Sequence, residues 1–122
     1  MSRFRPVSFR YAFEGIVHVL KTQPNARIHA AISLAVILVG LWIRLGRLEW
    51  AILVVMMAVV WVAELVNTAV EAAVDLATGE RHPLAKIAKD TAAGGVLVAA
   101  ILAVIVGLLI LGPPLWARLF GH

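Results

Sequence analysis

Three long apolar segments dominate the pattern of hydrophobic and polar positions along this chain. They cover residues 28–43, 50–63 and 92–111. A membrane-spanning helix needs about 20 mostly apolar residues and at least about 17. The third segment meets this length alone, whereas the second meets it only by including Glu64 and Asn67. The pattern therefore predicts three transmembrane helices, over residues 28–45, 49–76 and 91–112.

The segments on either side of these spans are amphipathic or rich in helix-breaking residues. In "FRYAFEGIVHVLK" apolar residues recur at helical spacing, which predicts an amphipathic surface helix within residues 1–24. Pro24 is expected to end or kink this helix, and Asn25 to cap the next one. In "LGPPLWARLFGH" the two prolines predict a helix stop, followed by an interfacial tail over residues 113–122.

The composition agrees with a single small membrane domain. Of the 122 residues, 62% are hydrophobic and only 15% are charged, and there is no cysteine for a disulfide or a thiolate metal site. A soluble helical bundle would need polar faces on its helices, and the first and third segments have almost none. We therefore expect an all-α integral membrane protein.

The placement of basic residues predicts which way the chain crosses the membrane. With three spans, the N-terminal segment and the second connection share one side. That side carries Arg3, Arg5, Arg10, Lys21, Arg27, Arg81, Lys86 and Lys89, and the other carries Arg44, Arg47 and Arg118. The excess of positive charge predicts that the N-terminus and residues 77–90 face the cytoplasm, in a multi-pass protein of the cell (inner) membrane. Anionic lipid headgroups account for these charges better than nucleic acid does.

A line of polar residues follows the second predicted span. Glu64, Asn67, Glu71 and Asp75 lie within roughly 80° of one another around a helix and extend over about 16 Å of its axis. A helix whose end simply leaves the bilayer would explain Asp75, but it explains Glu64 poorly. Because an ionisable group inside a span is costly and usually functional, Glu64 is a candidate general base.

The residues around this line match what an anionic substrate would require. Glu71 lies nearer the cytoplasm and is a candidate Mg²⁺ ligand, since Mg²⁺ favours one or two carboxylates together with phosphate oxygens. Lys86 and Lys89 follow in the loop and helix start over residues 77–90. Carboxylates opposite lysines could serve phosphoryl transfer, although lysines at the end of a span are commonly topology anchors. No Walker or protein-kinase glycine loop is present.

"AELVNTAVEAAVDL" followed by "RHPLAKIAKDTAAGGVLVAA" resembles the signature of the prokaryotic integral-membrane diacylglycerol kinase and undecaprenol kinase family. The resemblance runs from "FRYAFEGI" through the third span. It implies a homotrimer with one surface helix and three spans per subunit, and active sites shared between subunits at the cytoplasmic interface. The reaction that it implies is transfer of the ATP γ-phosphoryl group to a lipid hydroxyl.

The resemblance also implies roles for individual residues. Glu64 matches the catalytic base, Asn67 an asparagine near the reacting groups, and Glu71 a ligand of the metal that bridges the ATP phosphates. The position of a second metal-binding glutamate is Gln23, whose neutral amide is a weaker ligand for a hard cation. The positions implied to contact ATP are Tyr11, Asp75, Glu80, His82, Lys89 and Asp90, and those on the lipid side are Arg27, Trp42 and Glu64.

The acceptor lipid is a separate question from the reaction. "HPLAKIAKD" and "FRYAFEGI" resemble the undecaprenol kinase branch more than the diacylglycerol kinase branch, so we favour undecaprenol, with diacylglycerol as the alternative. Two hypotheses of another class are a non-catalytic membrane scaffold and a subunit that translocates protons or cations. Binding of Mg-ATP distinguishes the kinase hypothesis from these two, because a kinase must bind Mg-ATP and neither of the others needs to.

Overall fold

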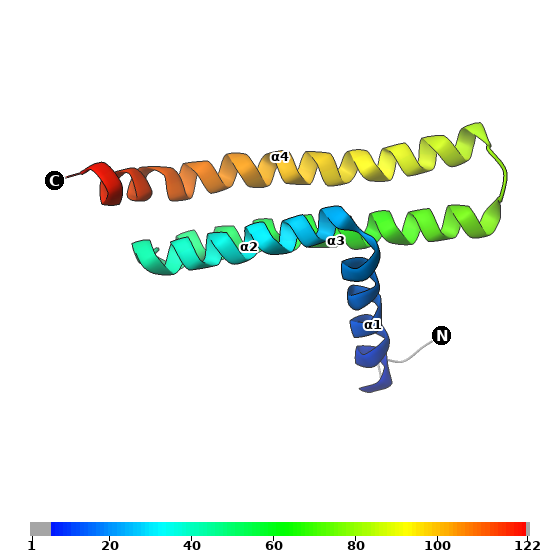
Figure 1. The fold of residues 1–122 in the computed structure, drawn as a ribbon, viewed down its shortest axis with the longest axis horizontal. Helices are drawn as coiled ribbons and strands as arrows, with labels where there is room; N and C mark the ends of the chain where they lie inside the picture. Colours follow the sequence, from blue (N-terminus) through cyan, green and yellow to red (C-terminus); the bar gives the residue numbers. More distant parts are fainter. Residues whose placement is uncertain (1–5, 122) are drawn as a thin grey trace.

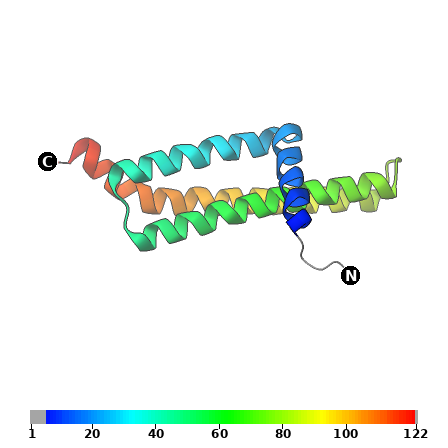
Figure 2. The ribbon, with the colours of Figure 1, turned by 90° about the horizontal axis from the view of Figure 1, so that it is seen from below.

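The computed structural model describes residues 6–121, which form four helices. They are α1 (Pro6–Thr22), α2 (Pro24–Ile43), α3 (Arg47–Ala77) and α4 (Pro83–Phe120). Helices α2, α3 and α4 run side by side as a bundle, and α1 stands across the bundle axis (Figures 1 and 2). No strand occurs in this part of the chain. Arg3 and Arg5, two of the basic residues on which the predicted membrane orientation rests, lie outside the described residues.

Three of the helices are long and apolar enough to cross a membrane, which confirms the predicted all-α fold with three long apolar helices. At 1.5 Å per residue, the 31 residues of α3 and the 38 residues of α4 give lengths of roughly 46 and 57 Å. Both exceed the hydrocarbon thickness of about 30 Å. The end of the bundle where α3 passes into α4 extends beyond the point at which α1 joins it (Figure 1). The C-terminal end of α3, which carries the last residues of the predicted polar line, lies in this extension (Figure 1).

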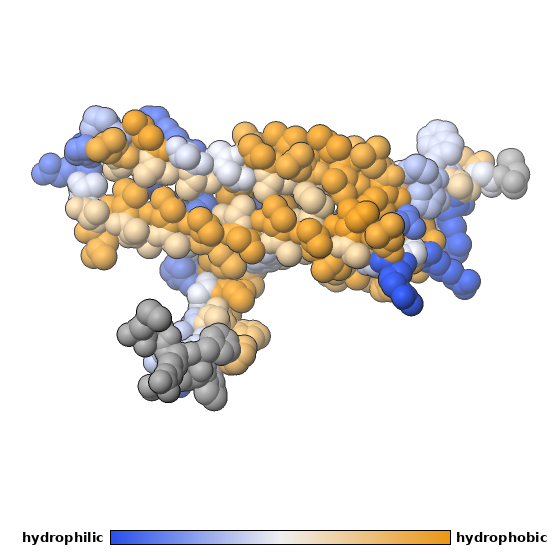
Figure 3. All heavy atoms as spheres, turned by 180° about the vertical axis from the view of Figure 1, so that it is seen from behind, coloured by the Kyte–Doolittle hydropathy of each residue, from blue (hydrophilic) through white to orange (hydrophobic). Residues whose placement is uncertain are grey.

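The surface of the bundle carries many exposed large apolar side chains. Apolar residues cover its middle, and polar residues gather at its two ends (Figure 3). Among the large apolar side chains, Leu38, Val55 and Leu108 are more than half exposed. Contiguous apolar surface of this kind indicates contact with lipid or with other protein chains.

Prolines begin three of the four helices, and the structure corrects the cap predicted beside one of them. Pro24 is the first residue of α2, and Gln23 occupies the capping position, so the predicted Asn25 cap is wrong. A proline is well suited to the first helical position, which places the cap one residue before it. Pro83 is the first residue of α4, within the predicted loop and helix start over residues 77–90, and the side chain of His82 caps this helix by accepting a 3.1 Å hydrogen bond from the Leu84 amide.

The predicted helix stop at Pro113 and Pro114 is also wrong, because α4 continues to Phe120. Each proline removes one N–H donor and leaves the rest of the helical ladder available, and apolar helices tolerate such losses. A tertiary contact also stabilises the extension: the Arg118 guanidinium lies 5.1 Å from the centre of the Trp42 ring on α2.

Candidate functional site

Glu64 is the centre of the candidate site because it is an almost fully buried carboxylate. Its relative exposure is 2%, on a face of α3 that packs inside the bundle. One carboxylate oxygen, Oε1, lies 3.1 Å from Nδ1 of His29 on α2. The distance suits a hydrogen bond, but the two groups are not aligned, so neither atom has a hydrogen bond in the described part of the chain. A buried polar atom without a partner costs about 1–3 kcal/mol, which makes this pair unusual.

Two further polar side chains are buried on the same face of α3. The Thr68 hydroxyl donates a 3.0 Å hydrogen bond to the backbone carbonyl of Glu64, one turn earlier. The Asn67 amide nitrogen donates a 3.2 Å hydrogen bond to Oε1 of Glu71. Glu71 is half-buried and Asp75 is exposed, so the line of polar residues passes from the interior of the bundle to its surface.

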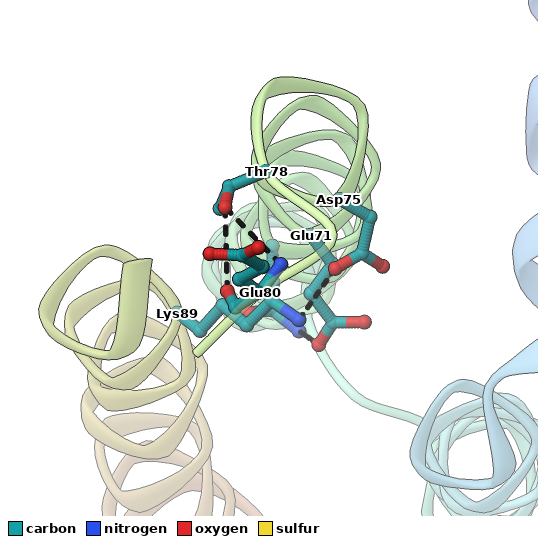
Figure 4. A network of polar contacts seen from close by, with 6 residues as sticks. Glu71, Asp75, Thr78, Glu80 and Lys89 are labelled. Carbon is teal, nitrogen blue, oxygen red and sulfur yellow. Dashed lines mark hydrogen bonds and ion pairs between the residues drawn. The ribbon is translucent and has the colours of Figure 1, made fainter. Parts of the chain in front are cut away.

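An ion pair joins the outer end of this line to α4. Lys89 Nζ donates a hydrogen bond of 2.6 Å to Oδ1 of Asp75 (Figure 4). This hydrogen bond raises the pKa of Lys89 above its ordinary value; desolvation opposes the rise, and the charges of Asp75 and Glu71 add to it. The lysine therefore keeps its positive charge beside two carboxylates on α3.

A hollow of about 700 Å³ lies between this ion pair and the α3–α4 loop. The charged and polar residues that line it are Asp75, Thr78, Glu80, Arg81, His82, Lys86, Lys89 and Asp90. The loop is ordered by Thr78, whose hydroxyl accepts from the Glu80 amide at 3.2 Å (Figure 4). Lys86 pairs with Asp90 on its own helix at 2.5 Å. The hollow combines both signs of charge, which suits a ligand that carries phosphates and a bound cation.

The remaining predicted positions lie apart from this hollow. Tyr11 is exposed on α1, and Gln23 lies at the break between α1 and α2. The Arg27 guanidinium donates a 3.2 Å hydrogen bond to the Lys21 carbonyl. Trp42 lies 13 residues after His29 on the same helix, which is about 20 Å along the axis. The structure thus brings the predicted ATP positions of α3, the loop and α4 together and leaves Trp42 at the far end of the bundle.

The residues present fit a Mg²⁺ ion that is held together with phosphates. The described residues contain no group of three or more His, Asp and Glu side chains that could hold a metal alone. Magnesium sites of nucleotide-dependent enzymes commonly use one or two carboxylates, with phosphate oxygens and water completing the shell. The partly exposed carboxylate of Glu71 and that of Asp75, one turn further along, could supply these one or two protein ligands.

An apolar cavity of about 400 Å³ lies among α2, α3 and α4, and the residues of α3 that line it precede Glu64 in the sequence. His29 lines one part of it, and most of the other lining residues are aliphatic. Sequence reasoning named neither this cavity nor His29 as part of the site. A histidine beside the start of a predicted span was the available signal, but its pairing with Glu64 depends on how α2 packs against α3.

Comparison with known proteins supplies independent information. A family model described as prokaryotic diacylglycerol kinase matches residues 10–111. The chain is 50% identical over 110 residues to a diacylglycerol kinase from Synechocystis sp., a match that covers 89% of this chain and 63% of that protein. It is 44% identical over 108 residues to an undecaprenol kinase from Bacillus subtilis, with 88% of each chain covered. A diacylglycerol kinase from Pseudomonas aeruginosa is 30% identical over 89 residues, 73% of this chain and 72% of that one.

The chain thus spans less than two thirds of the Synechocystis protein and most of the Bacillus one. The segment matched by the family model contains both the buried carboxylate Glu64 and the Asp75–Lys89 ion pair.

Proposed function

Because this chain belongs to the prokaryotic diacylglycerol kinase family, a family of lipid kinases, we propose that it transfers the γ-phosphoryl group of ATP to the hydroxyl group of a membrane lipid. The observation that carries this proposal is the burial of Glu64 among apolar helices, at the inner end of a polar line that reaches the surface at Asp75. Such a line joins a membrane-embedded reacting group to a water-soluble donor.

In the proposed reaction the Glu64 carboxylate accepts the proton of the lipid hydroxyl. The hydroxyl oxygen forms a bond to the γ-phosphorus as the bond between that phosphorus and the bridging oxygen of ADP breaks. Asn67 lies between Glu64 and Glu71 on the same face of α3, where its amide orients the Glu71 carboxylate through their hydrogen bond.

ATP is proposed to bind in the hollow at the α3–α4 loop. Lys89 and Asp75 lie at its wall, together with Glu80, His82 and Asp90. A Mg²⁺ ion bound with ATP would neutralise phosphate charge, and Glu71 would hold it, with Gln23 as a weaker second ligand. Lys89 lines the hollow and its ammonium group points towards Asp75 on α3, so phosphates bound between the two helices would lie within its reach. Tyr11 is proposed to approach the nucleotide from α1.

Undecaprenol is the proposed acceptor. The apolar cavity beside His29 extends along α4 from Ala100 to Leu115, about 22 Å of helix, which suits a long prenyl chain. The Bacillus relative is named an undecaprenol kinase. Trp42 and Arg27 would then contact the lipid at different depths. The name of the Synechocystis relative favours the second candidate, diacylglycerol.

We further propose a homotrimer in the cell membrane, with α1 as an amphipathic surface helix and with the N-terminus and the α3–α4 loop in the cytoplasm. The exposed apolar side chains of α2, α3 and α4 support extensive contacts with lipid and neighbouring subunits. Light scattering of the detergent-solubilised protein, corrected for bound detergent, tests the number of subunits.

The function is tested with purified protein in mixed micelles that contain Mg-ATP. Undecaprenol and diacylglycerol are offered in parallel, and labelled phosphate is followed into the lipid phase. Transfer to undecaprenol supports the proposal in full, and a preference for diacylglycerol corrects the acceptor. A folded protein that binds Mg-ATP but phosphorylates neither lipid contradicts the acceptor assignment. A folded protein that does not bind Mg-ATP supports a scaffold or a translocating subunit instead.

A further inference from the structure

The contact between His29 and Glu64 joins two helices at the most buried carboxylate of the described chain. The side chains are 19% and 2% exposed, and Nδ1 of His29 lies 3.1 Å from Oε1 of Glu64. Neither atom has an aligned hydrogen bond elsewhere in the described residues. Hydrogen bonds at active sites are commonly poorly aligned without substrate and tighten in the reacting complex.

The other polar side chains near Glu64 make no hydrogen bond to its carboxylate in the described structure. The Asn67 amide nitrogen donates to Glu71, and the Thr68 hydroxyl donates to the backbone carbonyl of Glu64. The apolar cavity adjoins the contact on the side of His29. His29 is therefore the side chain in the described structure that is placed to orient the carboxylate of Glu64.

We propose that His29 is a positioning residue for the proposed phosphoryl transfer. Its Nδ1–H donates to Oε1 of Glu64 and fixes the rotation of the carboxylate, which leaves Oε2 directed at the acceptor hydroxyl. The inference rests on the proposed kinase function. Its physical basis is that a displacement of about 1 Å in a catalytic group can lower the rate about a hundredfold.

Two substitutions of similar shape separate the hydrogen bond from the volume of the side chain. In His29→Asn the amide nitrogen can occupy the position of Nδ1 and donate to Glu64. In His29→Leu a methyl group takes that position and donates nothing. We expect His29→Leu to lower kcat about ten- to a hundredfold with the KM for Mg-ATP changed less than about twofold, and His29→Asn to retain most of kcat. The matched control is His18→Leu, on the exposed face of α1, which should leave both constants unchanged.

Equal values of kcat in the two His29 variants would overturn the proposal, as would a loss confined to the KM for Mg-ATP. Size-exclusion profiles of the variants must match that of the wild type for either result to count.

A spectroscopic measurement tests the contact without using activity. In protein labelled with ¹⁵N-histidine, we expect Nδ1 of His29 to carry a proton and its signal to move in Glu64→Leu, which removes the acceptor. Glu71→Gln, further along α3, should leave the signal in place. A bare Nδ1, or a signal that ignores Glu64→Leu, would overturn the role of His29. A folded wild type that neither binds Mg-ATP nor phosphorylates either lipid would instead contradict the proposed function, so the two failures are distinguishable.

Discussion

At the scale of single residues, the buried polar groups of the described chain lie on one face of α3. They are Glu64, Asn67 and Thr68. Burying a charged or hydrogen-bonding group in apolar surroundings is unfavourable unless it is paired, and the carboxylate of Glu64 has only the imperfect contact with His29. A helix of this kind would be more stable with an apolar residue at position 64, so the carboxylate is best explained by a role in the reaction.

The base assignment predicts the behaviour of Glu64→Gln. This variant keeps the size of the side chain but cannot accept the proton of the lipid hydroxyl, so kcat should fall about 10²–10⁴-fold. The thermal unfolding midpoint should not fall, because a neutral amide is easier to bury than a carboxylate. Labelled-phosphate transfer measures the first effect, and Glu14→Gln on the exposed face of α1 is the control. Near wild-type transfer by Glu64→Gln would mean that another group accepts the proton.

Lys89 has a predicted role in nucleotide binding. Lys89→Met removes a positive charge from the wall of the hollow, and the KM for Mg-ATP should rise about ten- to a hundredfold, the range for loss of one hydrogen bond to a charged group. Lys21→Met, on α1 and outside the hollow, should leave the KM unchanged. An unchanged KM in Lys89→Met would place the phosphates elsewhere.

The same lysine gives a prediction on pH. The hydrogen bond to Asp75 raises the pKa of Lys89 above 10.5. The charge, and any stabilisation that it contributes to the fold, is fully present below the unfolded value of about 10.4 and is lost only as the pH rises through the higher folded value. Between pH 6 and 9 the ratio of the KM for Mg-ATP in Lys89→Met to that in the wild type should therefore stay constant. A ratio that falls towards one by pH 9 would mean that Lys89 loses its charge in this range.

At the scale of the helices, local sequence signals predicted the three long apolar helices but not the contacts between them. The apolar segments and Pro24 predicted where the long helices lie, because hydrophobic length and proline geometry are local properties of the sequence. The extension of α4 past Pro113 was missed, since the contact between Arg118 and Trp42 joins residues far apart in the sequence. The same limit applied to His29, because nothing in "RIHAAIS" indicates which residue of α3 it meets.

A close approach of α2 and α3 gives a prediction at this scale. Gly40 is buried, and a Cβ atom there would lie 2.7 Å from Cη2 of Trp50 and 3.1 Å from Cδ1 of Leu45. Gly40→Ala should therefore destabilise the α2–α3 connection by about 1–3 kcal/mol, the usual cost of overpacking. The thermal unfolding midpoint in detergent measures this. In Gly95→Ala the added Cβ meets nothing within 4 Å, so that variant should be unaffected or slightly stabilised. Equal midpoints would show that Trp50 moves aside freely.

At the scale of the whole molecule, the bundle separates two environments that meet at Glu64. The loop between α3 and α4 carries a charged hollow beyond the crossing of α1, and the middle of the bundle contains the apolar cavity among α2, α3 and α4. Glu64 lies 11 residues before Asp75, about 16 Å along α3. The polar face of α3 therefore connects the charged hollow with the apolar part of the bundle, so a donor bound in the hollow would have to extend its phosphates along this face to meet an acceptor at Glu64.

If the apolar cavity holds the lipid chain, filling it should weaken binding of the acceptor lipid and leave binding of the nucleotide unchanged. Gly107 lines the cavity, and a Cβ atom there meets nothing within 4 Å, so Gly107→Leu occupies the space without a clash at the backbone. We expect the KM for undecaprenol to rise about tenfold, equivalent to about 1.4 kcal/mol, with the KM for Mg-ATP unchanged. Diacylglycerol, with its shorter chains, should be affected less.

Gly95→Leu is the matched control, because Gly95 lies on the same helix, has the same open space at its Cβ and does not line the cavity. Both variants replace a helical glycine with a better helix former, so a general effect on α4 would appear in both. A rise in the KM for undecaprenol in Gly107→Leu alone would place the prenyl chain between α2, α3 and α4. Equal KM values in the two variants would move the acceptor to the outer surface of the bundle, where the hydroxyl would have to reach Glu64 from a neighbouring subunit.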